Sequence, residues 1–158
     1  MSEVIVVPPG TIEPIFGLRI YSELSANVFT NNRGVVTIVT HQDIPLNNVI
    51  VIEDPTQARG YEFIVGDGND TILAAPNGVD KFSRMTVRAN GGNDFVITGA
   101  NDDFVFGGEG KDRLLGVEGD DRLYGGADDD WLRGGDGDDI LSGGICKTAK
   151  FLETTEHL

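Results

Sequence analysis

The sequence has little of several residue types that often carry chemistry or fix a fold. Of its 158 residues, one is cysteine, two are histidine and one is tryptophan. The single Cys146 excludes an intrachain disulfide. The histidines, His41 and His157, lie far apart in the chain and form no H-E-x-x-H motif. No apolar run approaches the ~20 residues of a membrane-spanning helix, so we expect no membrane span.

Basic residues are also scarce, and this limits the kinds of partner that the chain is expected to bind. Lys and Arg number 12 and Asp and Glu number 26, so the net charge is −14. A chain with this balance is not expected to bind nucleic acid or anionic membranes, because both attract Lys and Arg. Residues 65–144 hold 17 acidic and 7 basic side chains, which is −10 of the −14. This segment favours cations.

Catalytic signatures are missing as well. The sequence contains no G-x-S-x-G, no P-loop and no dinucleotide-binding fingerprint. Adjacent aspartates such as Asp102 and Asp103 resemble a carboxylate dyad, but their regular repetition favours a metal ligand beside a solvated neighbour. We therefore predict no enzymatic activity. The opening MSEVIVVPPG lacks a basic region and a long apolar core, so we expect no cleaved signal peptide.

Residues 1–64 differ in character from the rest. Short β-branched and aromatic runs, among them VIVV, VVTIV and YEFIV, alternate with turn signals such as Pro-Pro-Gly and Asp-Pro. These are strand signals, and no helix is indicated. We expect a β-rich N-terminal capping region over 1–64, because repeat arrays need atypical end units.

A nine-residue period occupies residues 65–144. The blocks from residue 107 read GGEGKDRLL, GVEGDDRLY, GGADDDWLR and GGDGDDILS, and weaker copies begin at 65 and 75. Aspartate stands sixth and an apolar residue eighth in each block. The eighth residues are Ile72, Phe82, Val96, Val105, Leu114, Leu123, Leu132 and Leu141. A disordered Gly/Asp-rich segment would not need this apolar residue. Residues 145–158 form a non-repetitive tail.

Glycine at this density excludes a helix. We expect positions one to six to turn and positions seven to nine to form a short strand, whose side chains alternate between faces. Two blocks then close one coil of 18 residues, and stacked coils form two parallel sheets with the eighth side chains between them. The predicted fold is all-β, a parallel β-roll, or right-handed β-solenoid, with a β-rich N-terminal cap.

The aspartates should then stack about 4.8 Å apart. Carboxylates at that separation repel by roughly 1 kcal/mol in water and more where water is excluded. A cation between successive turns removes this repulsion, and carboxylate and carbonyl oxygens suit Ca²⁺ better than Zn²⁺. The complete pairs 94/112, 112/130, 103/121 and 121/139 predict four ions, and the partial turn at 143 a fifth.

The predicted ligands are Asp94, Asp103, Asp112, Asp121, Asp130 and Asp139, with turn backbone from Gly107, Gly108, Gly110, Gly116, Gly119, Gly125, Gly126, Gly134, Gly135 and Gly137. Asp70 and Asp80 are out of strict register and are weaker candidates.

The pattern G-G-x-G-x-D-x-U-x, which GGEGKDRLL and GGDGDDILS match in full, resembles the RTX, or hemolysin-type, calcium-binding nonapeptide repeat. The resemblance implies a calcium-loaded parallel β-roll, bacterial origin, type I secretion and folding after export. Some turns depart from the pattern. Asn101 and Asp128 replace the fourth glycine, Val117 the second, and Thr98 and Ala89 the first.

Two functions follow as expectations. The first is an extracellular, calcium-stabilised module with a structural, secretion-linked or adhesive role, secreted without a cleaved N-terminal signal. The alternative is the calcium-binding fragment of a secreted enzyme or toxin whose catalytic part lies elsewhere. Outward-facing aromatic residues at the start of the roll, such as Phe104 and Phe106, favour a cap that covers them. The outward-facing Trp131, far from that end, further suggests a partner or self-association through the outer sheet face.

Overall fold

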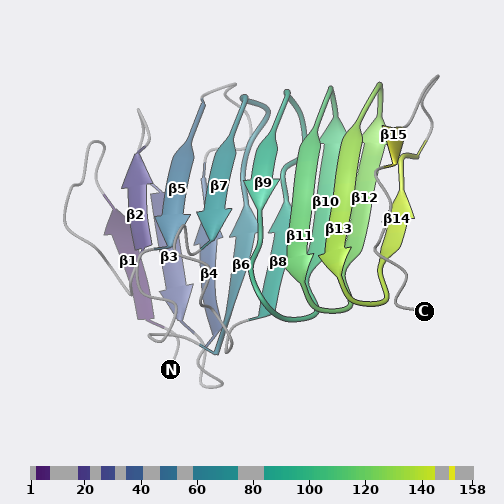
Figure 1. The fold of residues 1–158 in the computed structure, drawn as a ribbon. Helices are drawn as coiled ribbons and strands as arrows, with labels where there is room; N and C mark the ends of the chain where they lie inside the picture. Colours follow the sequence, from purple (N-terminus) through teal and green to yellow (C-terminus); the bar gives the residue numbers. More distant parts are fainter. Residues whose placement is uncertain are drawn as a thin grey trace.

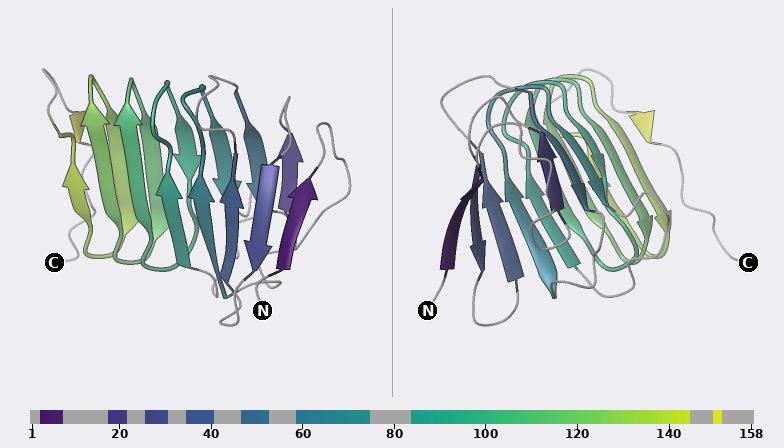
Figure 2. Two further views of the ribbon diagram at one scale, coloured as in Figure 1. Left: turned by 180° about the vertical axis from the view of Figure 1, so that it is seen from behind. Right: turned by 90° about the vertical axis from the view of Figure 1, so that its left-hand side faces the viewer.

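The computed structural model describes residues 3–7, 18–21, 26–30, 35–40, 47–52, 59–74, 84–144 and 150–151. Every element in these ranges is a β-strand, and no helix occurs among them. The strands form two sheets that face each other, and from β4 onward successive strands of the chain lie alternately in one sheet and the other (Figure 1). Views from behind and from the side show the successive coils lying one behind the next (Figure 2).

The eight-stranded sheet has the order β1-β3-β4-β6-β8-β10-β12-β14. Its strands are β1 Glu3–Val7, β3 Ala26–Thr30, β4 Val35–Val39, β6 Gly60–Ile64, β8 Arg84–Arg88, β10 Phe104–Glu109, β12 Arg122–Ala127 and β14 Ile140–Ser142. The seven-stranded sheet has the order β15-β13-β11-β9-β7-β5-β2. Its strands are β2 Leu18–Tyr21, β5 Val49–Ile52, β7 Thr71–Ala74, β9 Phe95–Ile97, β11 Arg113–Glu118, β13 Trp131–Asp136 and β15 Lys150–Phe151.

The repeat region forms the predicted parallel β-roll. In one sheet Val105 of β10 pairs in parallel with Leu123 of β12, and in the other Leu114 of β11 pairs with Leu132 of β13. Both steps are 18 residues, so two nine-residue blocks make one coil. The all-β fold and the coil length expected from the sequence are therefore confirmed.

The strands of the repeats are longer than expected. Strands β10 to β13 each contain six residues, because the first three positions of the following block continue the ladder. Gly108, for example, pairs with Gly126 of the next coil. The expectation that positions one to six are all turn was thus wrong. A neighbouring coil offers hydrogen-bond partners to these backbone groups, which one block by itself lacks.

The core between the sheets consists of one continuous cluster of apolar side chains. The eighth-position residues Ile72, Val96, Val105, Leu114, Leu123 and Leu132 are all fully buried. Leu141 is partly buried and packs against this cluster. The predicted core is therefore confirmed for these positions, whereas Phe82 lies outside the described residues.

Parallel coils also extend toward the N-terminus beyond residue 65. Strand β4 pairs in parallel with β6, and β5 pairs in parallel with β7. Antiparallel pairing occurs between β1 and β3, β3 and β4, and β2 and β5. The division at residue 64 stays a prediction about domains, but both sheets cross that point without a break. We propose that the antiparallel strands, rather than all of 1–64, form the cap.

Candidate metal centre

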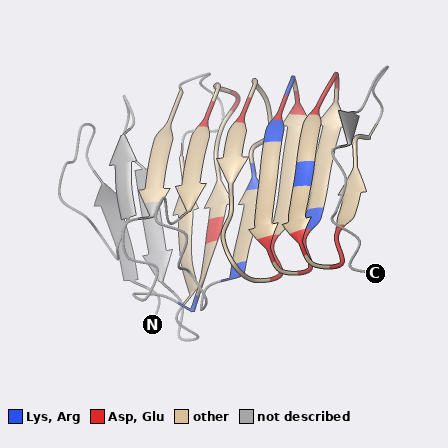
Figure 3. Cartoon of the chain, in the orientation of Figure 1, with Lys and Arg blue, Asp and Glu red and all other residues tan. Residues whose placement is uncertain are grey.

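The sixth-position aspartates lie in two rows, one at each end of the coil. Each directly precedes a strand, as Asp112 precedes β11 and Asp121 precedes β12. Figure 3 shows acidic residues concentrated at the turns between the strands of the repeats. The structure therefore brings the predicted ligands together at 18-residue steps.

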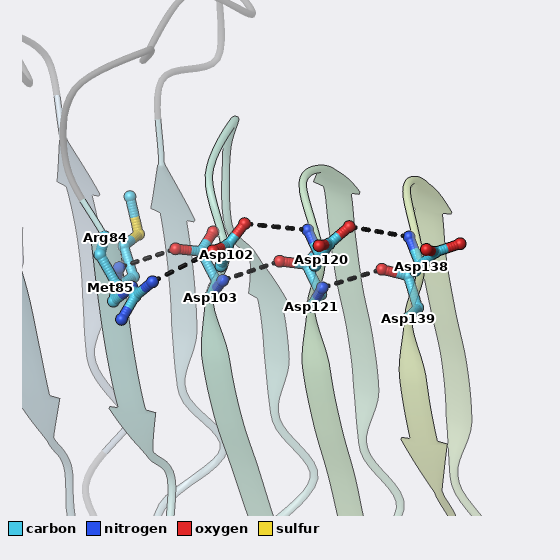
Figure 4. A network of polar contacts seen from close by, with 8 residues as sticks. All are labelled: Arg84, Met85, Asp102, Asp103, Asp120, Asp121, Asp138 and Asp139. Atoms are coloured by element: carbon cyan, nitrogen blue, oxygen red, sulfur yellow. Dashed lines mark hydrogen bonds and ion pairs between the residues drawn. The ribbon is translucent and has the colours of Figure 1, made fainter.

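Backbone hydrogen bonds join the aspartates of each row. The amide of Asp94 donates to Oδ1 of Asp112 at 2.9 Å, and that of Asp112 donates to Oδ1 of Asp130 at 3.0 Å. In the other row the amides of Asp103 and Asp121 each donate over 2.9 Å to Oδ1 of the next aspartate (Figure 4). One oxygen of each receiving carboxylate is thereby fixed, which leaves the other for a different partner.

Most of these second oxygens have no hydrogen-bond partner. They are buried Oδ2 atoms, and they belong to Asp70, Asp94, Asp112, Asp121, Asp130 and Asp139. A buried, unpaired carboxylate oxygen is costly. A regular series of such atoms indicates a binding partner, such as a cation, that the protein itself does not supply.

Burial also makes several of these carboxyl groups hard to ionise. The pKa of Asp94 and of Asp121 is raised to about 8, chiefly by desolvation and in part by nearby carboxylates. Desolvation likewise raises the pKa of Asp112 to about 7 and of Asp70 to about 6, and it raises the pKa of Asp130. A bound cation would reverse this preference by stabilising the charged form.

The oxygens of neighbouring turns approach the same space. A Cβ placed on Gly107 would lie 2.2 Å from Oδ2 of Asp112 and 2.6 Å from the carbonyl oxygen of Gly125 in the next coil. A Cβ on Gly116 would lie 1.8 Å from Oδ2 of Asp121 and 2.7 Å from the carbonyl oxygen of Gly134. Glycine at the first position therefore leaves room for the carboxylate beside a carbonyl oxygen from the next turn.

The second and fourth positions of the block need glycine for a different reason. At Gly108 the backbone has φ +122°, which L side chains rarely adopt. The residues that replace glycine here also have positive φ, namely Val117 at 101°, Asn101 at 148° and Asp128 at 75°. Asn and Asp tolerate this region better than a β-branched residue does, so Val117 is the strained member.

Asp70 continues the row of Asp94 and Asp112, although its spacing in the sequence is irregular. Its amide donates to Oδ1 of Asp94 at 2.8 Å, although 24 residues separate them. Its own Oδ1 accepts hydrogen bonds from the amide and the side-chain Nδ2 of Asn48, at 2.6 and 2.7 Å. Sequence reasoning missed Asn48. The available signal was the dipeptide Asn47-Asn48, which matches Asn69-Asp70 in the next coil.

Asp80, the other weaker candidate, lies outside the described residues, as do Cys146 and both histidines.

The fifth-position residues form a separate, exposed ladder. The amide of Asp120 donates to Oδ1 of Asp102 at 3.2 Å, and that of Asp138 donates to Oδ1 of Asp120 at 2.9 Å (Figure 4). Arg84 pairs with Asp102 at 3.1 Å on the surface. These side chains are exposed, whereas Asp103 and Asp121 beside them are buried. This contrast separates a solvated neighbour from a candidate ligand.

Comparison with known proteins assigns the repeats. Residues 86–114 and 115–145 match the family model of the RTX calcium-binding nonapeptide repeat. This part of the chain belongs to that family. No match was found among curated proteins or solved structures. In the part of the chain that the structure describes, no helix is long and apolar enough to cross a membrane.

RTX repeats bind calcium, and the residues present fit a hard cation of this kind. Among the described residues, no three His, Cys, Asp or Glu side chains gather around one point. Carboxylates of two turns together with carbonyl oxygens such as those of Gly125 and Gly134 would therefore hold each ion. An all-oxygen donor set of this composition suits Ca²⁺, which accepts six to eight oxygen ligands.

Proposed function

We propose that the protein is an extracellular, calcium-stabilised β-roll whose ions lie between the aspartate turns of successive coils. The observation that carries this proposal is the series of buried Oδ2 atoms without a hydrogen-bond partner. Each repeats at the same place in its turn, and in the turns of Asp112 and Asp121 a carbonyl oxygen of the next coil lies close by.

Calcium in these turns would stabilise the fold in two ways. It neutralises carboxylates that would otherwise repel along the row, and it satisfies buried oxygens. At ten times the dissociation constant, each ion adds about 1.4 kcal/mol of stability. Several ions bound together are enough to decide whether glycine-rich coils fold, since whole domains are stable by only about 5–15 kcal/mol.

An extracellular setting determines the affinity that we expect. Modules that work outside cells bind calcium at roughly 10⁻⁴ to 10⁻³ M. A chain of this kind would stay unloaded where calcium is scarce and fold where it is abundant. The role that fits is a structural, secretion-linked or adhesive module, since the RTX repeat is a structural calcium-binding unit.

A calcium titration of the full chain tests the proposal. Far-ultraviolet circular dichroism should change from a coil-rich to a β-rich spectrum as calcium replaces chelator. Magnesium at the same concentrations is the control, because it prefers smaller octahedral sites and keeps its water. A fully β-rich spectrum in excess chelator would contradict the proposal.

A further inference from the structure

The turn formed by residues 98–103 differs from the later turns at its first position. Glycine stands there in the turns that begin at 107, 116, 125 and 134, and the aspartate of the same turn lies against it. In the turn before them the residue is Thr98, which is only 1% exposed. Its side chain therefore occupies space that the later turns leave to the carboxylate and its ligand.

The hydroxyl group of Thr98 binds the oxygen that an ion would need. Its Oγ1 donates to the carbonyl oxygen of Gly116 at 2.9 Å and lies 3.3 Å from that of Leu115. Gly116 holds the same first position in its block as Gly125, one block later, and Gly134, two blocks later. In the later turns those carbonyl oxygens face a carboxylate, whereas here the carbonyl oxygen already accepts a hydrogen bond.

The carboxylate of this turn is also satisfied. Oδ2 of Asp103 accepts a hydrogen bond from the amide of Gly99 at 3.2 Å. By contrast, Oδ2 of Asp121, in the next turn of the same row, and Oδ2 of Asp94, in the other row, have no partner. Ala89, at the first position in the turn of Asp94, has no hydroxyl group, and Oδ2 of that aspartate has no partner.

We propose that Thr98 replaces a calcium ion between the turns of Asp103 and Asp121. This inference rests on the proposed function, because it assumes that calcium occupies the turns whose oxygens are unpaired. The 103/121 pair then contributes no ion, although its sequence spacing is regular. Asp121 shares an ion only with Asp139, and the first step of this row is held by hydrogen bonds alone.

Calcium stoichiometry of the full chain tests the proposal. We expect Thr98→Gly to bind one more ion per chain than the wild type, measured by equilibrium dialysis with elemental analysis. Thr98→Ser keeps the hydroxyl and is the matched control, so its stoichiometry should equal that of the wild type. Gly116→Thr makes the reciprocal change in a turn whose first residue is glycine, and this variant should bind one ion fewer than the wild type.

The outcomes separate this inference from the proposed function. If the wild type binds no calcium, the proposed function fails. If the wild type binds calcium but Thr98→Gly binds the same number of ions, this inference alone is wrong. Gain of an ion in both Thr98→Gly and Thr98→Ser would also overturn it, because the hydroxyl would then not be the determinant. Should Gly116→Thr not fold, the two Thr98 variants still decide.

Discussion

The coils before β10 and the coils after it are built on the same two sheets but are held together differently. The earlier coils bury large side chains, among them Ile38, Tyr61, Phe63 and Met85. The later coils contribute one valine or leucine per strand, and their turns bury aspartates. We therefore expect a coil of this roll to be stabilised either by a larger apolar core or by a cation that binds between the aspartate turns.

Both aspartate rows end at a neutral residue on their N-terminal side. On one side Asn48 donates to Asp70, and on the other the amide of Met85 donates to Oδ1 of Asp103 at 2.7 Å. Neither neutral residue adds a further carboxylate to its row. The earlier coils can thus stack without a cation at these steps, and this contrast leads to four predictions.

Removal of calcium should have the largest effect and should affect the two regions unequally. In excess chelator we expect the amides of β10 to β14 to exchange rapidly, while those of β4 and β6 stay protected. The reason is that most of the buried carboxylates of the two rows belong to the later coils, from Asp103 onward, whereas β4 and β6 lie beside large apolar side chains. Hydrogen exchange of the full chain, read by mass spectrometry, measures this. Equal loss of protection in both regions would show that the early core does not stand alone.

A single ligand change should have the next largest effect. Asp121→Asn keeps the acceptor for the amide of Asp103 but removes the charge, so we expect the calcium midpoint to rise about tenfold, or about 1.4 kcal/mol. Asp120→Asn is the matched control one residue away, on the exposed ladder, and should shift the midpoint little. Equal midpoints for the two variants would mean that the buried row does not hold the ions.

A lower pH should stabilise the calcium-free fold but should weaken the binding of calcium. The raised pKa values of Asp94, Asp112 and Asp121, about 7 to 8 against 3.8, mean that the calcium-free fold binds more protons than the unfolded chain. Its stability should therefore fall as the pH rises from about 4 to about 8. Protons compete with calcium, so the calcium midpoint should rise as the pH falls.

Thermal unfolding across this pH range, with and without calcium, measures both trends. Calorimetry in buffers of different ionisation enthalpy should detect proton release on calcium binding near pH 7. Calcium-free stability that rises with pH would contradict the assignment of these groups as buried and protonated.

Relief of strain in one later turn should have the smallest effect. Val117 has φ +101° and is 42% exposed, so its side chain contributes little burial in return for the strained backbone. Val117→Gly should stabilise the loaded protein by about 1–2 kcal/mol, or roughly 2–8 °C in Tm. Val117→Ala removes the same branched side chain but keeps a Cβ, and it should recover less. Equal gains would place the effect in the side chain rather than the backbone.

The repeats could be read from the sequence because each block carries its own signals. Leucine at the eighth position, aspartate at the sixth and glycine at the turns depend on local geometry with a fixed period of nine. Stacking such blocks leaves one consistent register, so the β-roll, its core and the pairing of Asp112 with Asp130 followed directly. The exposed partners such as Asp120 were likewise separated correctly from the buried row.

Tertiary structure alone decided where the period breaks. Asp70 lies under Asp94 because β7 pairs with β9 in register, although the sequence spacing is 24 residues rather than 18. Asn48 joins the same row from outside the recognisable repeats. Thr98 looked like a weak copy of glycine, yet its hydroxyl bonds a carbonyl oxygen 18 residues away. These contacts arise between coils, and a single block does not contain the partner that defines them.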